Sequence, residues 1–225
     1  MKAQKHDLRW MIGVALMAAV IVLLANTPLG MIQLPVIKAS TAHIPVIIGA
    51  IVLGPLAGSI LGGVFGICSM ISNTVAPTLL SFAFSPFMTN EGIVGGLKAI
   101  WISVGCRILI GLVAGWMWIG LKRIKANDFI ALPVVGFIGS MTNTILVMGS
   151  IYFLLAQQYA QAKEVAVTAV FSLIMGTVSV AGIAEAVVAL ILVTAISKPL
   201  LEAFKRIEKE NFNRNKRKKK SKLKG

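Results

Sequence analysis

The sequence predicts an all-α integral membrane protein: a six-transmembrane-helix bundle whose N- and C-termini are cytoplasmic. Two observations lead to this fold class. Hydrophobic residues make up 57% of the 225 residues and charged residues only 13%, whereas a soluble domain carries about 25% charged residues. The few charges also lie in short segments between long apolar runs. A chain with this pattern places most of its length in lipid.

Six apolar runs are long enough to cross a bilayer, which takes about 20 residues. No charged residue separates the second run from the third, and we place that boundary near residue 65. The stretch 49–66, GAIVLGPLAGSILGGVFG, repeats glycine at three- and four-residue spacings, which favours close packing of helix backbones. Pro55 within it predicts a kink. The expected spans cover residues 10–32, 42–65, 66–87, 99–121, 129–156 and 165–196.

Three basic clusters orient these spans. They precede the first span, follow the fourth and follow the sixth, so an even number of spans separates any two of them. All three then lie on one side of the membrane, and the excess of Lys and Arg assigns that side to the cytoplasm. The outer side keeps only the isolated Lys38, Lys98 and Lys163. The clusters consist of Lys2, Lys5 and Arg9; of Lys122, Arg123 and Lys125; and of the residues after Ser197.

The chain divides into a membrane domain, 1–197, and a basic tail, 198–225. The tail holds twelve Lys and Arg against three Glu. Basic runs also occur in nucleic-acid-binding proteins, but this one directly follows a membrane span. We therefore expect a disordered cytoplasmic tail that lies against anionic lipid, and no nucleic-acid partner.

Arg107 is the residue most indicative of function. It lies eight residues inside the apolar run 99–121, which contains no acidic residue. This places it roughly 12 Å below the outer end of the span. A guanidinium in hydrocarbon costs at least about 2.5–3.5 kcal/mol, so it normally faces an interior and has a partner. The partner is a ligand carboxylate held in bidentate geometry, the carboxylate of Glu185 or a backbone carbonyl, and the sequence leaves these open.

Three more polar side chains complete the candidate substrate-binding set of Arg107, Asn143, Asn73 and Glu185. Asn143 lies in the fifth span, at a depth similar to that of Arg107, and either contacts a ligand or bonds neighbouring helices. Asn73 lies in the third span. Glu185 lies deeper, in the sixth span, either as a partner of Arg107 or as a ligand contact. His43 opens the second span and is expected at the membrane interface.

The outer connections, 33–41 and 85–98, are longer and richer in turn residues than the inner ones. Such loops above a helical bundle form either a lid over a binding site or simple links. Tryptophans mark both membrane surfaces, as aromatic belts do. Trp101 is expected at the outer surface, and Trp116 and Trp118 at the inner one.

Catalytic and metal-binding motifs are absent from the sequence. It contains no GxxxxGK[ST] phosphate loop, HExxH or GxSxG, and its two histidines, His6 and His43, are too dispersed for a metal site. We therefore expect neither an enzyme nor a metal or cofactor. The spans also lack a proton-relay series of acids and an inverted repeat, which many secondary transporters have. A binding bundle without an energy source of its own suggests a subunit that borrows one.

Several stretches resemble one family. They are HIPVIIGAIVLGPLAGSILGGVFGICS at 43–69, FSPF at 84–87 and CRILIGLVAGW at 106–116, together with Ala15 and Ala19 spaced as AxxxA within GVALMAAVIVL. The sequence resembles the substrate-binding S components of energy-coupling factor (ECF) vitamin transporters. The first stretch and FSPF look closest to the pantothenate branch of that family. The resemblance covers all six spans.

The resemblance implies a six-helix protein of the bacterial cell membrane that captures a water-soluble vitamin, with pantothenate favoured, from outside. It also implies partners: a transmembrane coupling subunit that docks on Ala15 and Ala19, and two cytoplasmic ATPases. Pantothenate carries a carboxylate, an amide and two hydroxyls, which suits Arg107, Asn143 and Asn73. The alternatives are another vitamin or precursor, such as hydroxymethylpyrimidine or riboflavin, and a stand-alone membrane facilitator.

Overall fold

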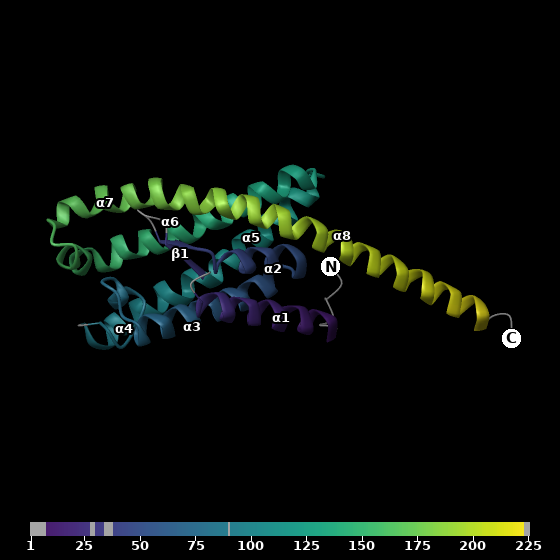
Figure 1. Ribbon diagram of the computed structural model, residues 1–225, viewed down its shortest axis with the longest axis horizontal. Coiled ribbons are helices and arrows are strands. Elements are labelled where there is room, and N and C mark those ends of the chain that lie inside the picture. The colour runs from purple at the N-terminus through teal and green to yellow at the C-terminus, as the bar shows by residue number, and fades with distance from the viewer. Residues whose placement is uncertain (1–7, 28–29, 34–37, 90, 223–225) are drawn as a thin grey trace.

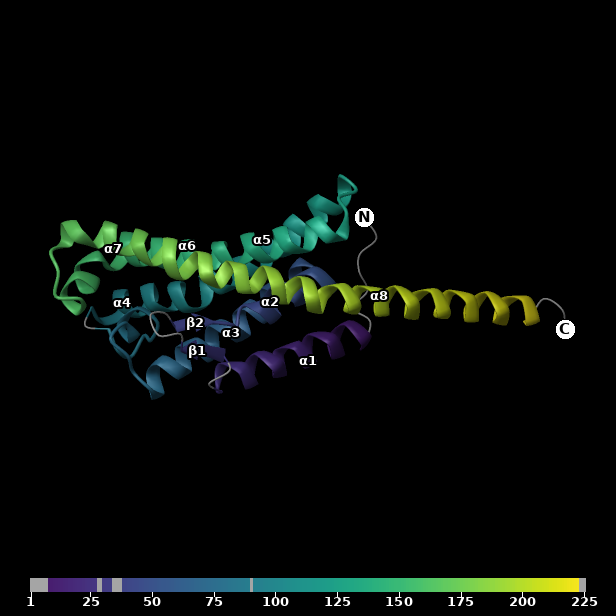
Figure 2. The same cartoon turned by 45° about the horizontal axis from the view of Figure 1, so that its top comes forward.

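The computed structural model describes residues 8–27, 30–33, 38–89 and 91–222. In this part of the chain the helices run side by side along one long axis, and a short β-hairpin packs beside them (Figures 1 and 2). The hairpin pairs Met31 with Ser40 and Gln33 with Lys38 in antiparallel register. It is the one departure from the predicted all-α fold, and it lies where the sequence predicted an outer connection.

The described elements follow one another with short turns between them. In chain order they are α1 (Leu8–Ala25), β1 (Met31–Gln33), β2 (Lys38–Ser40), α2 (Ile44–Leu53), α3 (Pro55–Val75), η2 (Ser81–Ala83), α4 (Gly92–Ile100), η3 (Trp101–Gly105), α5 (Cys106–Arg123), α6 (Asp128–Ala162), η4 (Val167–Ala169), α7 (Val170–Thr177), η5 (Val178–Gly182) and α8 (Ile183–Lys222).

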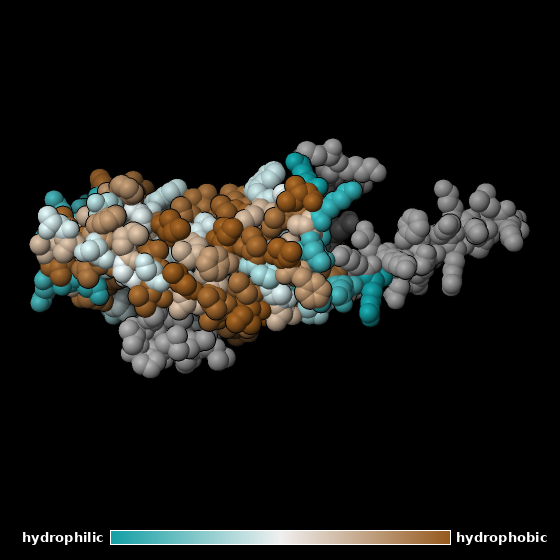
Figure 3. Space-filling view, turned by 90° about the horizontal axis from the view of Figure 1, so that it is seen from above, coloured by the Kyte–Doolittle hydropathy of each residue, from teal (hydrophilic) through white to brown (hydrophobic). Residues whose placement is uncertain are grey.

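Four of the described helices are long and apolar enough to cross a membrane. They span Pro55–Val75, Gly92–Arg123, Asp128–Ala162 and Val167–Ala203, while Trp10–Ala25 and Ile44–Leu53 form shorter apolar helices. The ten residues of α2 rise only about 15 Å, half the thickness of a bilayer core. The described helices therefore give four candidate membrane spans and two shorter apolar helices, and the predicted count of six complete spans is not confirmed. The surface in Figure 3 is brown along its middle, with teal residues towards both ends, as a membrane protein requires.

The predicted boundary between the second and third spans is wrong. The chain turns at Gly54, and α2 and α3 replace the predicted spans 42–65 and 66–87. Gly54 has φ +96°, a conformation that side chains disfavour, and Pro55 begins α3 because a first helical residue needs no donor. Glycine and proline therefore end one helix and begin another, where the sequence predicted a kink.

The glycines of α3 pack against the backbone of α5 and of the preceding turn η3, as their spacing predicted. A Cβ atom at Gly58 would lie 2.7 Å from the carbonyl oxygen of Gly111, one at Gly62 would lie 2.1 Å from that of Arg107, and one at Gly66 would lie 2.5 Å from that of Ser103. No side chain fits in this space, so the two helices approach more closely than larger residues allow. This contact fixes the backbone of α5 around Arg107.

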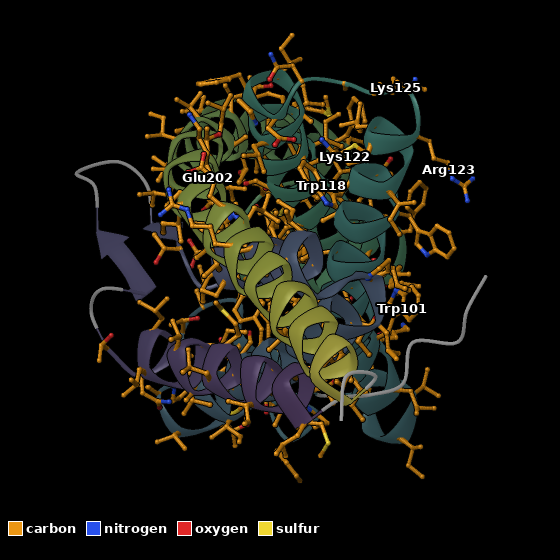
Figure 4. All side chains as sticks on the ribbon, turned by 90° about the vertical axis from the view of Figure 1, so that its right-hand side faces the viewer. Trp101, Trp118, Lys122, Arg123, Lys125 and Glu202 are labelled. Carbon is orange, nitrogen blue, oxygen red and sulfur yellow. The ribbon has the colours of Figure 1, made fainter. Side chains whose placement is uncertain are left out.

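The basic segments gather at one end of the bundle. The start of α1, the turn between α5 and α6 and the free part of α8 all lie there (Figure 1). Figure 4 views the molecule from this end and shows Arg123 directed away from the bundle. This arrangement agrees with the predicted orientation and leaves its cytoplasmic assignment a prediction. Lys2 and Lys5, which belong to the same argument, lie outside the described residues.

The tail differs from the expected disordered segment. α8 continues without interruption to Lys222, with Pro199 inside it, and projects beyond the other helices (Figure 2). Leu, Glu, Lys and Arg dominate the first turns after Pro199, and all four are good helix formers. Glu202 and Arg206 also have the i,i+4 spacing that supports a helix. High charge therefore does not prevent helix formation here.

Trp118 does not lie in the aromatic belt that the sequence predicted for it. It is only 9% exposed and packs in the main apolar cluster with Ile44, Ile110 and Val193, whereas Trp116 is 58% exposed. Only one of the two tryptophans can therefore face lipid. Residues two apart on a helix point in directions about 200° apart, so both cannot belong to one belt.

Candidate ligand-binding site

Arg107 lies in the first turn of α5, directly after the π-helical turn η3. Its side chain is 7% exposed, and its Nη1 donates a hydrogen bond of 2.7 Å to the carbonyl oxygen of Ile102. A π turn widens the helix and shifts its hydrogen bonds by one residue, as the bond from the Cys106 amide to Trp101 shows. The backbone carbonyl that the sequence left open as a partner is therefore present.

Two aromatic rings enclose the guanidinium. Its Cζ lies 5.4 Å from the ring centroid of Phe65 on α3 and 5.2 Å from that of Phe84, which follows η2. At these distances each ring attracts the cation through its quadrupole. Among the described residues, however, Arg107 has only the bond to Ile102, and its Nε has no hydrogen-bond partner. The protein therefore leaves the Nε donor of this buried guanidinium unused within the described residues.

Glu185 is not in direct contact with Arg107. The ion pairs within the described residues join Lys98 to Glu91 and Lys122 to Asp128. Neither of these ion pairs includes Glu185 or Arg107. The internal salt bridge that rivalled a ligand carboxylate in the sequence is therefore not formed.

A cavity of about 460 Å³ opens beside Arg107, at the end of the bundle opposite the basic segments. Arg107 and Lys163 are its cations, and no acidic residue is among its described lining. Apolar groups from α1, α3 and α6 supply much of the remaining wall. The lining consists of Ala25, Gly30, Ala42, Phe65, Cys68, Ser69, Ser72, Asn73, Thr78, Leu79, Leu80, Phe84, Arg107, Met148 and Lys163. This combination suits a small anionic ligand that carries both polar and apolar groups.

Asn73 lines the cavity and also holds the loop that covers it. Its Nδ2 donates to the carbonyl of Ser69 at 2.9 Å, and its Oδ1 accepts a bond of 2.9 Å from the hydroxyl of Ser81. The same hydroxyl accepts a bond of 2.7 Å from the amide of Thr78. Asn73 therefore fixes the segment 78–84, and its second Nδ2 proton is the donor it can still offer a ligand.

A second set of contacts ties this loop to α6. The carboxylate of Glu91 accepts a hydrogen bond of 2.8 Å from Lys98 and another from the side chain of Gln158. The bond from Lys98 is the main reason that the pKa of Glu91 lies below its usual value. No described residue of the predicted connection 85–98 lines the cavity, so the choice between a lid and a simple link stays open for it. The segment 78–84, which the sequence placed at the end of the third span, supplies four lining residues and is called the lid below: Thr78, Leu79, Leu80 and Phe84.

Asn143 and Glu185 do not line this cavity. On α6, a Cβ at Gly139 would contact Ala114, and the Leu146 carbonyl lies 3.7 Å from the sulfur of Cys106. Asn143 lies between these two levels, roughly one turn below Arg107. The two residues therefore differ by about one helical turn, and the guanidinium widens the gap because it reaches back towards Ile102. Their similar depth stays a prediction. Asn143 is 8% exposed, and its Oδ1 has no hydrogen-bond partner in the described part of the chain.

His43 is part of the core and not of the membrane interface. It is 1% exposed and shares a hydrogen bond of 3.0 Å between its Nε2 and the hydroxyl of Ser140. Ser140 lies one turn from Asn143 on α6. Gly182 of η5 packs against Thr144, and Ala189 of α8 packs against Gly136, so Glu185 lies near the level of Ser140. A polar layer therefore continues beneath the cavity.

Ala15 and Ala19 lie on the outer surface of α1, where both are exposed. The other side of α1 packs against α2 and α3 through Val14 and Ile21. The AxxxA pair therefore does not serve packing within the described bundle.

Sequence reasoning missed three groups at the site. Phe65 and Phe84 were present in the quoted stretches but were not assigned a role, although an aromatic ring is a natural neighbour of a buried cation. Lys163 was treated as an isolated outer charge, since nothing in the sequence relates the end of α6 to Arg107.

Comparison with known proteins gives two findings. The sequence model of the family described as "ECF transporter, substrate-specific component" matches residues 9–197. The chain is also 33% identical over 171 residues to the pantothenic acid transporter PanT of Lactococcus lactis subsp. cremoris (strain MG1363). That alignment covers 74% of this chain and 80% of the relative.

Proposed function

Because the chain belongs to the family of ECF transporter substrate-specific components, we propose that it captures pantothenate outside the cell for import. The family consists of transporter components, in line with the expectation that this chain is not an enzyme. Pantothenic acid is the ligand named for the relative PanT, which is 33% identical to this chain over 171 aligned residues.

The observation that carries the proposal is Arg107 beside a cavity whose described lining contains no acid. A carboxylate bound there receives charge-assisted hydrogen bonds from guanidinium donors that the protein itself leaves unused. The hydroxyls of Ser69 and Ser72 and the amide of Asn73 are available to the hydroxyls and amide of pantothenate. The cavity volume of about 460 Å³ lies within the range of about 300–1,000 Å³ that small-molecule sites occupy.

We propose that Asn143 and Glu185 act on the end of the ligand that lies farther from the cavity mouth than Arg107. Asn143 contacts a ligand that extends about one turn below Arg107, where its Oδ1 has no hydrogen-bond partner among the described residues. Glu185 acts on the same region through its field at Arg107. Both roles require that the cavity lengthens when ligand binds.

For delivery, we propose that the chain works with a transmembrane coupling subunit and two cytoplasmic ATPases. Ala15 and Ala19 are exposed along α1, and small residues at this spacing allow a helix of another subunit to approach closely. The same proposal places the six apolar segments in a bacterial cell membrane, with both termini at the cytoplasmic, basic end and the cavity at the outer end.

The direct test is pantothenate binding to the purified protein by isothermal titration calorimetry. Arg107→Gln should weaken binding about 10- to 150-fold, because a hydrogen bond to a charged group contributes about 1.5–3 kcal/mol. Arg123→Gln removes the same charge at the far end of the bundle and should leave binding unchanged. Equal affinity of wild type and Arg107→Gln would contradict the role of Arg107.

Two further measurements separate the alternatives. Mass spectrometry of the small molecules that copurify identifies another vitamin if pantothenate is not the ligand. Uptake into liposomes that contain this chain alone would indicate a stand-alone facilitator. Uptake that requires the coupling subunit and ATPases is the expected result.

A further inference from the structure

The cavity has a second cation, Lys163, at the end of α6. We propose that Lys163 is the capture residue of the site: its ammonium attracts the ligand carboxylate to the cavity mouth, from which it passes to Arg107. This inference rests on the proposed binding of pantothenate and adds to it the group that sets the rate of binding.

The two cations differ in exposure. Lys163 is exposed, whereas Arg107 is 7% exposed and lies between the rings of Phe65 and Phe84. Both line the same cavity. A ligand that arrives from water therefore meets the ammonium of Lys163 before it meets the guanidinium of Arg107.

The backbone at Lys163 is held by a well-defined turn. The Glu164 amide donates 3.2 Å to the carbonyl of Gln161, and the Val165 amide donates 3.0 Å to that of Ala160. This pair of bonds, with Glu164 at φ +53°, is the Schellman arrangement that ends many helices. Lys163 therefore extends from a fixed point at the cavity mouth and not from a loose loop.

The charges around Lys163 leave its field available. Glu91, an acid at the same end of the bundle, is paired with Lys98. Glu164 follows Lys163 directly and is exposed, but no ion pair between them occurs in the described part of the chain. The described lining has two positive groups and no negative one, so its field attracts anions.

A field of this kind acts on the rate of association. At physiological salt, charges interact over about 8 Å, which covers the approach to the mouth but not the bulk solution. Clefts lined by one sign of charge raise association rates by about 10- to 1,000-fold, and the gain falls steeply with salt. A lysine that only stabilises the C-terminal end of α6 through the helix dipole would instead change thermal stability and leave association unchanged.

Rapid-mixing kinetics of pantothenate binding to the full chain distinguish these roles. At low ionic strength Lys163→Gln should slow association about three- to tenfold, with little change in dissociation, and the difference should vanish near 1 M salt. Lys163→Arg, which keeps the charge, should restore the rate. Lys125→Gln, which removes one charge from the opposite end, should bind like wild type. Panthenol, in which an alcohol replaces the carboxylate, should be insensitive to Lys163→Gln.

Each outcome decides the question. If wild type binds pantothenate and Lys163→Gln associates at the same rate, Lys163 is not the capture residue. Faster dissociation with unchanged association would also overturn the inference, because Lys163 would then be a contact in the bound state. If wild type binds no pantothenate, the proposed function itself fails, and this inference fails with it.

Discussion

The two ends of α5 carry positive charge in opposite ways. Near its outer end Arg107 is buried, and the described protein gives it one backbone carbonyl and two aromatic rings but no ion pair. Near its inner end Lys122 is exposed, forms a 2.5 Å ion pair with Asp128 and lies over the ring of Trp118. A charge that serves only the structure is neutralised by the protein. Arg107, for which we propose a ligand, is instead buried without an ion pair among the described residues, and burying such a charge is costly.

The backbones at the two ends differ in the same sense. Near Arg107, the glycines of α3 let the backbone of α3 touch the backbone of α5. At the other end of α5, Gly120 has no neighbouring atom within 4 Å of an added Cβ. The outer end of α5 is therefore rigid where it positions the guanidinium. The other end of α5 only has to make the turn into α6. Three substitutions test this contrast, in order of decreasing effect.

Gly62→Ala should have the largest effect, because its Cβ would lie 2.1 Å from the carbonyl oxygen of Arg107, a backbone atom that cannot move aside. We expect a loss of stability of about 3 kcal/mol and loss of pantothenate binding. Gly120→Ala, with no atom within 4 Å, should be neutral or slightly stabilising. Thermal unfolding in detergent measures the stability of both variants, and calorimetry measures their pantothenate binding. Equal unfolding temperatures for the two variants would contradict the role of the α3–α5 contact.

Phe84→Leu should have an intermediate effect. It keeps an apolar group in the lid but removes the ring 5.2 Å from the guanidinium. A desolvated cation–π contact contributes about 1–2 kcal/mol, so pantothenate affinity should fall about five- to thirtyfold by calorimetry. The matched control is Phe153→Leu, whose ring is 82% exposed and should not affect binding. If both variants bind like wild type, the ring does not help to position Arg107.

Lys122→Gln should have the smallest effect. The variant loses an exposed ion pair, which is worth less than about 1 kcal/mol. Pantothenate affinity should stay within about twofold of wild type, and the small loss of thermal stability should disappear at high salt. A loss of affinity comparable to that of Arg107→Gln would show that the two ends of α5 do not differ as described.

Some residues of the candidate site could be identified from the sequence, and others could not. Arg107 was identifiable because a charge in an apolar run is costly wherever the helix points. Asn73 and Asn143 are both amides within spans, and their sequence environments look alike. Only one of them lines the cavity, because that depends on how each helix is rotated about its axis. The rings of Phe65 and Phe84 meet at Arg107 from segments that are separated in the chain.

Helix boundaries, too, could be predicted only in part from the sequence. Hydropathy located the apolar segments, but it placed a helix end near residue 65 when Gly54 and Pro55 make the turn. Averaged over a window, hydropathy does not respond to one backbone conformation. The hydropathy argument therefore could not detect the positive φ at Gly54 that ends α2.

Hydropathy and charge along the chain were enough to predict a membrane protein, the grouping of its basic segments and the unusual position of Arg107. Each of these follows from hydrophobicity and charge, which add along the chain and do not depend on which residues meet. The folded arrangement was needed to show that Phe65, Phe84 and Lys163 line a cavity with Arg107, and that no ion pair joins Glu185 to Arg107 among the described residues. Those outcomes depend on helix rotation and on close contacts such as that of Gly62 with Arg107, which only packing between distant segments can set.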